Sequence, residues 1–147
     1  MFSGVAPYPL VFARNSKASV IYGVEMNPVA HKFAEQNVLA NKFWNRIRLV
    51  RGDVRKVIPA LGLKFDRVLM PMPKTAEEFL PVAFKASKKG TIVHYYDFGR
   101  EEEFDAIKKK IISACKKAKK KCKILRAVKA GDYAPGVYRV CVDFQLL

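Results

Sequence analysis

A strand, an acidic residue and a helix start follow one another in the stretch SVIYGVEMNP, residues 19–28. Residues 19–25 form a short apolar run with β-branched side chains, which predicts a strand that ends at Glu25. Asn27 offers a side-chain oxygen to the free amides of a helix, and Pro28 suits the first helical position because its missing N–H costs nothing there. The stretch therefore predicts the strand-to-helix turn of a βαβ unit.

The same alternation of short apolar runs and amphipathic segments extends along the chain. Further strands are expected at residues 46–51, 65–70, 90–97, 123–128 and 137–146, and helices at 7–14, 28–42, 54–60, 75–86 and 100–121. This order is typical of an α/β fold built around a parallel sheet. The short, turn-rich connection between the last two strands favours an antiparallel pair.

The composition is that of a folded and strongly basic protein. The 147 residues are 50% hydrophobic, which excludes a disordered chain, and their number favours a single domain. A net charge of +15 attracts polyanions such as RNA, DNA or an acidic membrane surface. No apolar run reaches the ~18 residues of a membrane span, and no signal peptide is recognisable, so we expect a cytoplasmic protein. Three cysteines at spacings that match no metal or redox motif are expected to be free thiols.

Lysines crowd the second half of the segment 100–121. Its apolar residues recur at three- and four-residue spacing and predict one helix face on the core: Phe104, Ile107, Ile111, Cys115, Ala118 and Cys122. The lysines then lie on the other faces. Two interpretations stay open for them, a solvated helix face or a surface that faces RNA, because so many like charges repel one another unless an anion offsets them.

Candidate ligand-binding residues lie on either side of the predicted strand 19–25. Gly4 belongs to a small-residue loop ahead of a helix, where backbone amides can approach a ligand. Glu25 follows Gly4 by 21 positions and ends the strand, where a carboxylate can accept hydrogen bonds from both ribose hydroxyls of a nucleotide-like cofactor. The alternative for Glu25 is a surface acid beside the Asn27 cap.

Two other predicted strands are followed by candidate site residues. Asp53 is placed either to meet the amino group of a bound adenine or to cap the next helix, and one residue can do both. Pro71 and Pro73 stiffen a loop that borders the substrate side of an open α/β sheet. This loop is interpreted as a rigid wall for a flat base or as a plain stiff turn.

No catalytic base emerges from the sequence. His94 is expected to be a packed strand residue, and His31 a helix-surface residue with nothing nearby to orient it. Asp97 and Glu25 are the acids expected near the ligand-binding side of the sheet, and Glu25 is already the candidate ribose contact. The catalytic residues therefore stay unknown.

Seven short segments resemble, in the same order, one family of enzymes. They are MFSGVAP (1–7), GVEMNP (23–28), NVLAN (37–41), GDVR (52–55), DRVLM (66–70), GTIVHYY (90–96) and YAPGVY (133–138). This pattern resembles the archaeal and eukaryotic tRNA guanine-37 N1-methyltransferases. It is shared by the related wyosine-pathway enzymes, which transfer the aminocarboxypropyl group of the same cofactor to tRNA.

The resemblance implies a fold, a cofactor and a substrate. The fold would be the Rossmann-like class I S-adenosylmethionine-dependent methyltransferase fold with a C-terminal antiparallel strand pair. The cofactor would be S-adenosyl-L-methionine, without a metal, and the substrate tRNA. The implied cofactor contacts are Phe2, Gly4, Val5, Glu25, Met26, Asp53 and Val54. The target guanine would lie against Pro71, Met72 and Pro73.

The chain departs from the family at two places. The family usually has asparagine then proline after the fourth strand, whereas Pro71 stands at the asparagine position here and cannot donate a hydrogen bond. The chain also begins inside the first motif. We therefore expect one domain over residues 1–147 without the family's first strand, and a tRNA-recruiting part on an upstream domain or separate subunit. The alternatives to a methyltransferase are an aminocarboxypropyltransferase and a non-catalytic RNA-binding fragment or subunit of a split enzyme.

Overall fold

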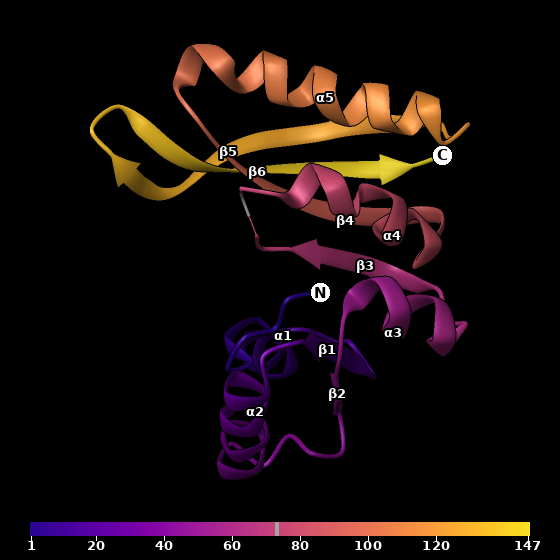
Figure 1. Ribbon diagram of the computed structural model, residues 1–147, viewed down its shortest axis with the longest axis vertical. Helices are drawn as coiled ribbons and strands as arrows, with labels where there is room; N and C mark the ends of the chain where they lie inside the picture. The colour runs from indigo at the N-terminus through magenta and orange to yellow at the C-terminus, as the bar shows by residue number, and fades with distance from the viewer. Residues whose placement is uncertain (73) are drawn as a thin grey trace. The chain divides into compact units, whose positions relative to one another are not determined.

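The computed structural model describes residues 1–72 and 74–147, so that the predicted substrate contact Pro73 lies outside the described residues. The chain divides into two compact units, Met1–Leu61 and Gly62–Leu147. Figure 1 shows the elements of both units.

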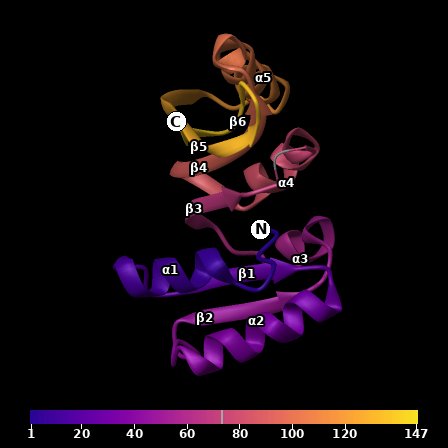
Figure 2. The ribbon, with the colours of Figure 1, turned by 90° about the vertical axis from the view of Figure 1, so that its left-hand side faces the viewer.

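The first unit holds two parallel strands and three helices. In chain order they are α1 (Pro7–Asn15), β1 (Ile21–Glu25), α2 (Pro28–Ala40), β2 (Ile47–Arg51) and α3 (Val54–Leu61). The parallel register pairs Ile21 with Ile47 and Glu25 with Arg51. Figure 2 shows α2 running beside β2. The predicted strand–helix–strand unit is therefore confirmed.

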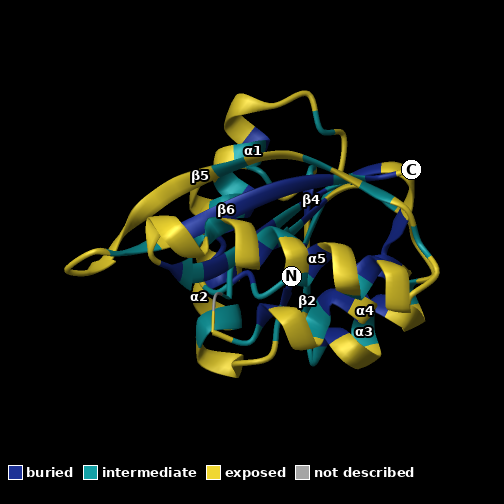
Figure 3. Cartoon of the chain, turned by 90° about the horizontal axis from the view of Figure 1, so that it is seen from above, coloured by how far each residue is buried: buried dark blue, intermediate teal, exposed yellow. Residues whose placement is uncertain are grey.

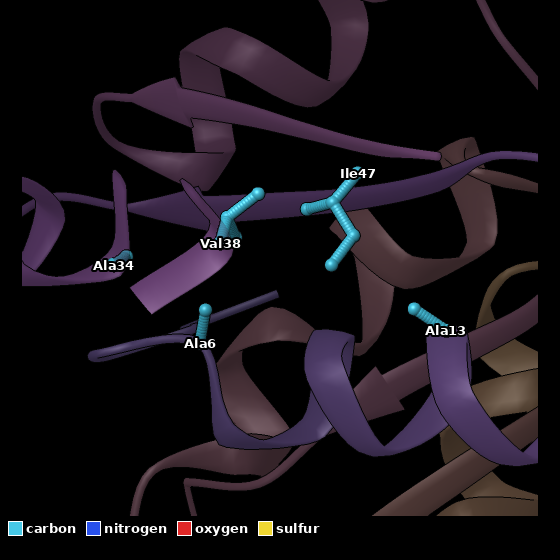
Figure 4. Packing of buried hydrophobic residues seen from close by; sticks show 5 residues of the cluster. All are labelled: Ala6, Ala13, Ala34, Val38 and Ile47. Atoms are coloured by element: carbon cyan, nitrogen blue, oxygen red, sulfur yellow. The ribbon is translucent and has the colours of Figure 1, made fainter. Parts of the chain in front are cut away.

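Small side chains form the core of the first unit. Ala6 and Ala13 from the α1 segment pack with Ala34 and Val38 of α2 and with Ile47 of β2 (Figure 4). Alanines at three of these five positions suit a close approach of the helices, because a methyl group keeps the backbones near one another. This packing fixes the segment around Ala6, which immediately follows the predicted ligand-binding loop.

The start of α2 follows the prediction. Asn27 Oδ1 accepts hydrogen bonds from the amides of Val29 at 2.9 Å and Ala30 at 3.3 Å, and Pro28 occupies the first turn. The cap satisfies two amides that have no partner within the helix. Since Asn27 follows Glu25 by two positions, the cap also fixes the backbone next to the predicted cofactor acid.

The second unit is a four-stranded mixed sheet with helices. Its elements are β3 (Phe65–Met70), the 3-10 turn η1 (Ala76–Phe79), α4 (Leu80–Lys85), β4 (Ser87–Gly99), η2 (Glu101–Glu103), α5 (Phe104–Lys117), β5 (Cys122–Ala134) and β6 (Val137–Leu146). The strand order is β3-β4-β6-β5. β3 and β4 are parallel, and β6 is antiparallel to both β4 and β5. The predicted C-terminal antiparallel pair is confirmed.

The described strands form two separate sheets. Among the described residues, β1 pairs with β2 alone and β3 pairs with β4 alone. β1 and β3 therefore each have one edge without a strand partner.

Helix α5 covers one face of the four-stranded sheet. Its Ile107, Ile111 and Cys115 are buried, and Figure 3 shows buried and exposed sides along the helix. Ile107 Cδ1 lies 3.0 Å from the position that a Cβ on Gly99 would take, which places α5 on the Gly99 side of β4. Side chains alternate along a strand, so His94 belongs to the opposite face.

Several predicted element bounds are wrong. The helix expected at 100–121 ends at Lys117, and Cys122 belongs to β5. The helix expected at 75–86 is a 3-10 turn followed by the six-residue α4. β5 continues to Ala134 through irregular pairing, so that the turn before β6 consists of Pro135 and Gly136. None of the described helices is long and apolar enough to span a membrane.

Candidate cofactor-binding site

The Gly4 loop and Glu25 meet at the carboxyl end of β1. Glu25 Oε2 accepts a hydrogen bond from the Gly4 amide at 2.8 Å, and Oε1 accepts one from the Asn27 amide at 2.8 Å. The Ser3 amide donates to the Val24 carbonyl at 2.9 Å, which holds the loop along the strand. A carboxylate offers about four lone-pair directions, so that each oxygen keeps acceptor capacity for a further donor. The structure thus brings together the two sequence-predicted parts of this site.

The loop before α1 has an unusual backbone. Phe2, Gly4 and Ala6 have φ angles of 55°, 53° and 70°. The left-handed region costs a residue with a side chain roughly 1–2 kcal/mol, and such strain persists where surrounding contacts fix it. A Cβ placed on Gly4 would meet no atom within 4 Å, so the loop is open on that side. Open space beside a fixed amide and a carboxylate is suited to a ligand.

Gly23 lets this loop pack against β1. A Cβ on Gly23 would lie 2.8 Å from Leu49 Cδ2 and 3.1 Å from Ser3 Oγ, closer than ordinary van der Waals contact. Any larger residue would push the loop away from the strand. Gly23 therefore positions the loop without contacting a ligand itself.

A backbone hydrogen bond holds the segment before Asp53 beside Glu25. The Gly52 amide donates to the Glu25 carbonyl at 2.8 Å, which ties the end of β2 to the end of β1. Asp53 Oδ1 accepts from the Arg55 amide at 2.8 Å, and Oδ2 lies 2.6 Å from Arg55 Nη2. The hydrogen bonds from the Arg55 side chain and amide hold the pKa of Asp53 below its ordinary value. The capping interpretation is confirmed, and the adenine contact stays a prediction.

The remaining predicted cofactor residues differ in exposure. Met26 is 66% exposed and Val5 is 43% exposed, so both side chains are accessible to a ligand beside Glu25 and the loop. Val54 is buried at the start of α3. Only the backbone of Val54 is therefore available for binding. A shallow groove lined by Val29, Phe33 and Arg51 lies along α2 rather than at the Gly4 loop.

The predicted base-binding loop belongs to the second unit. Pro71 and Met72 follow β3 directly, are partly buried and have no helical or strand assignment. Their contact with a target base stays a prediction.

Asp97 is held in a structural ion pair. Its Oδ2 accepts from Lys110 Nζ at 2.7 Å and from Tyr95 Oη at 3.2 Å, and its Oδ1 accepts from the Phe98 amide at 2.9 Å. The carboxylate is almost fully buried. Both oxygens of this carboxylate are already occupied by donors of its own unit, so that Asp97 serves the packing of α5 on β4. We assign no catalytic base.

A polar network on the other sheet face was not foreseen from the sequence. Arg67 Nη1 lies 3.1 Å from His94 Nε2, and His94 Nδ1 lies 2.6 Å from Asp143 Oδ1. Arg126 Nε donates to Asp143 Oδ2 at 2.6 Å. A guanidinium only donates, so Nε2 accepts and Nδ1 carries the proton. The pairing of His94 with Asp143 across β4 and β6 supplies this contact, and the only sequence signal is their place in two apolar strands.

His94, Cys141 and Asp143 carry metal-ligand atoms within 4.8 Å of one another. Arg126 already occupies Asp143, however, and Arg67 occupies the other nitrogen of His94. Burial raises the pKa of the Cys141 thiol to about 12, which opposes the thiolate that a metal needs. The cluster is therefore a hydrogen-bonded network.

His31 differs from its prediction as a free helix-surface residue. Its side chain is 12% exposed, and Nε2 lies 3.4 Å from Glu35 Oε1 one helical turn away. Spacing of four residues brings two side chains onto the same helix face, which explains the contact. Glu35 thus orients His31.

Comparisons with known proteins bear on this site. A profile of the TRM5/TYW2 methyltransferase domain matches residues 1–125. The tRNA (guanine(37)-N(1))-methyltransferase Trm5b of Pyrococcus abyssi is 33% identical over 147 residues, which cover 99% of this chain and 42% of that protein. The tRNA(Phe) (4-demethylwyosine(37)-C(7)) aminocarboxypropyltransferase of Pyrococcus horikoshii is 31% identical over 151 residues, covering 99% and 52%.

A solved structure with a bound cofactor is also similar. The crystal structure of M. jannaschii TYW2 in complex with AdoMet superposes with a TM-score of 0.86 at 28% identity, covering all of this chain and 67% of that one. This chain spans about two fifths of the length of the Trm5b relatives that it matches. The class I methyltransferase fold is therefore shared over the full length described.

Proposed function

Because the chain belongs to the TRM5/TYW2 methyltransferase domain family, we propose that it is an S-adenosylmethionine-dependent tRNA methyltransferase that acts on guanine-37. The observation that carries the proposal is the carboxylate of Glu25, held at the end of β1 by the amides of Gly4 and Asn27 at 2.8 Å each. An oriented carboxylate in this position is suited to both hydroxyls of a ribose.

The residues of the first unit fit the cofactor by their chemistry. Glu25 accepts from the ribose, and the open side of Gly4 accommodates the methionine end. The adenine lies near Met26, with the free lone pairs of Asp53 and the backbone of Val54 as hydrogen-bonding groups. Phe2 and Val5 complete the loop that encloses the cofactor. When bound, the cofactor supplies the electrophilic methyl group.

The target base is proposed to lie against Pro71 and Met72. A proline-stiffened loop offers a flat base a rigid apolar surface without hydrogen-bond donors. Selection of guanine would then come from other groups, because Pro71 cannot supply the donor that the family's asparagine would. Pro73 belongs to the same predicted wall.

A second candidate function uses the same site. The aminocarboxypropyltransferase relative is 31% identical, close to the 33% of the methyltransferase relative. Both reactions use one cofactor and differ in which carbon on the sulfonium sulfur faces the nucleophile. Product analysis after incubation with tRNA and cofactor labelled in the methyl group would separate them, since only methyl transfer labels the RNA.

Both units are proposed to belong to one methyltransferase domain. The family profile covers residues 1–125, which includes parts of both units and so supports this proposal. The tRNA-recruiting part is proposed to lie on an upstream domain or a separate subunit. We place this tRNA-modifying activity in the cytoplasm.

Calorimetric titration with S-adenosylmethionine tests the proposal. Glu25→Ala should weaken binding roughly 10- to 100-fold, because hydrogen bonds to a charged group contribute about 1.5–3 kcal/mol each. Its thermal midpoint should change much less. Glu35→Ala is the matched control, because it removes the same charge from an exposed position of α2. Its affinity for S-adenosylmethionine should be unchanged.

Two outcomes would contradict the proposal. A lower thermal midpoint of Glu25→Ala with unaltered affinity would make Glu25 a flank of the Asn27 cap. A folded wild-type chain that binds no cofactor would favour the non-catalytic RNA-binding fragment or subunit.

A further inference from the structure

Ten lysines gather at one edge of the second unit, and we call this the lysine edge. Lys64 precedes β3, while Lys85, Lys88 and Lys89 flank the start of β4. The other six belong to the segment 116–123, which runs from the last turn of α5 into β5. Phe65 pairs with Ser87, and Cys122 pairs with Leu146, so the sheet register places these segments at the same edge. In Figure 1 this is the end of the sheet near the C-terminus.

This edge accounts for the whole net charge of the second unit. Among the described residues, Asp66 is the one acid that we count with these ten lysines, because it pairs with Lys88. The rest of the unit has nine basic and nine acidic side chains, which balance. Lys108, Lys109 and Lys110 fall in this balanced part, close to Asp105 and Asp97. The charge is therefore concentrated at one place rather than spread along α5.

Few acceptors within the unit offset this charge. Lys88 Nζ pairs with Asp66 at 2.7 Å, and Lys64 Nζ donates to the Lys85 carbonyl at 2.6 Å. Of the ten lysines described, Lys88 alone is in an ion pair within 4.0 Å. Nine are exposed and Lys120 is half-buried. Exposed like charges at this density repel one another and favour an external polyanion.

The lysine edge and the loop predicted to contact the base lie at opposite ends of the strands. β3 and β4 are parallel, and their carboxyl ends lead away from the lysines toward Pro71 and Gly99. The turn between β5 and β6 lies at that same far end. The six residues of β3 separate the two edges by roughly 20 Å at the rise of an extended strand. One nucleotide does not span this distance.

We infer that the lysine edge binds the phosphate backbone of the substrate RNA several nucleotides away from the target base. This inference rests on the proposed function. Ammonium groups attract phosphates without reading sequence, so the edge would add affinity and orientation rather than choice of base. A membrane-surface helix needs an apolar face toward lipid, whereas α5 buries Ile107, Ile111 and Cys115 within its own unit. RNA is therefore the favoured polyanion.

Two sets of four substitutions test this inference on the full chain. The edge set is Lys85→Gln, Lys89→Gln, Lys117→Gln and Lys121→Gln. The control set is Lys17→Gln, Lys32→Gln, Lys42→Gln and Lys109→Gln, which are exposed positions elsewhere with the same total change of charge. The measurements are tRNA affinity against salt concentration, the thermal midpoint, S-adenosylmethionine affinity, and binding to vesicles that contain anionic lipid.

The edge set should lower the slope of log affinity against log salt by about 3 to 4, because each lost phosphate contact removes nearly one unit. The control set should change this slope by less than about 1. In both sets the cofactor affinity should stay unchanged and the thermal midpoint should not fall, because removing like charges relieves repulsion. The inference would be overturned if both sets lost tRNA affinity equally, or if the edge set lost none. An edge set that loses vesicle binding but keeps tRNA binding would overturn it as well. The two proposals can fail separately. If the wild-type chain binds no cofactor but the edge set still loses tRNA binding, this inference stands and the proposed function fails.

Discussion

Asp143 holds side chains from two neighbouring strands in place. It lies on β6 and accepts hydrogen bonds from His94 on β4 and from Arg126 on β5, both at 2.6 Å. Burial raises the pKa of its carboxyl, but the hydrogen bonds from Arg126 and His94 outweigh that effect and keep the pKa below its ordinary value. The charged carboxylate is thus the form that stabilises the sheet.

Replacing Asp143 with asparagine should lower the free energy of unfolding by about 1–3 kcal/mol, because one of the two donors then faces an amide NH2. The depressed pKa means that this stabilisation is present above the unfolded-state pKa of about 3.9 and is lost as pH falls through the lower folded-state value. Urea unfolding at pH 7 and pH 3 measures both effects.

Asp66→Asn is the control for this prediction, because Asp66 is an exposed carboxylate in a surface pair with Lys88. Its effect on the free energy of unfolding should be much smaller than that of Asp143→Asn, because solvent screens an exposed pair. A difference between wild type and Asp143→Asn that is the same at both pH values would contradict the assignment of the charged carboxylate as the stabilising form.

Local residue patterns were predictable, and contacts across the sheet were not. Asn27 caps its own helix, and Glu25 ends the strand that follows the Gly4 loop, so the order of neighbouring elements along the chain sufficed. Asp143 meets His94 only through the register of β4 and β6, which short spacings do not determine. The prediction for His31 was wrong, because the four-residue spacing to Glu35 brings both side chains onto one helix face.

At the scale of elements, the end of α5 is set by backbone conformation. Lys119 has a φ of 54°, the Lys119 amide donates to the Lys116 carbonyl, and the Lys120 amide donates to the Cys115 carbonyl, both at 2.9 Å. These bonds form the Schellman motif that commonly ends a helix, with lysine where glycine is usual. The apolar spacing continues through Ala118 and Cys122, so periodicity alone extended the predicted helix too far.

Lys119→Gly should therefore raise stability by about 1 kcal/mol, since glycine removes the left-handed strain of a residue with a Cβ. The thermal midpoint should rise by about 3 °C. Lys119→Ala removes the same charge and keeps the strain, so it should not share the gain. Equal midpoints for the two variants would show that Lys119 is not strained.

At the scale of the whole molecule, the two units have different tasks. The first unit gathers the predicted cofactor contacts around Glu25, and the second carries the predicted base wall at one edge and the lysine edge at the other. The alternation of strands and helices and the antiparallel pairing of β5 with β6 could be predicted from alternating apolar runs and a short connection. The concentration of charge could not, because it depends on bringing Lys64, Lys89 and the segment 116–123 to one edge.

The most direct test of the account is a titration of the amide nuclear magnetic resonances of the full chain with S-adenosylmethionine. The central claim places the cofactor on the Gly4 loop and the ends of β1 and β2. The largest shifts should therefore fall on the amides of Gly4, Asn27 and Val54, with little change in the segment 116–123. Largest shifts along the groove of α2 or at the lysine edge, or none at saturating cofactor, would contradict the claim.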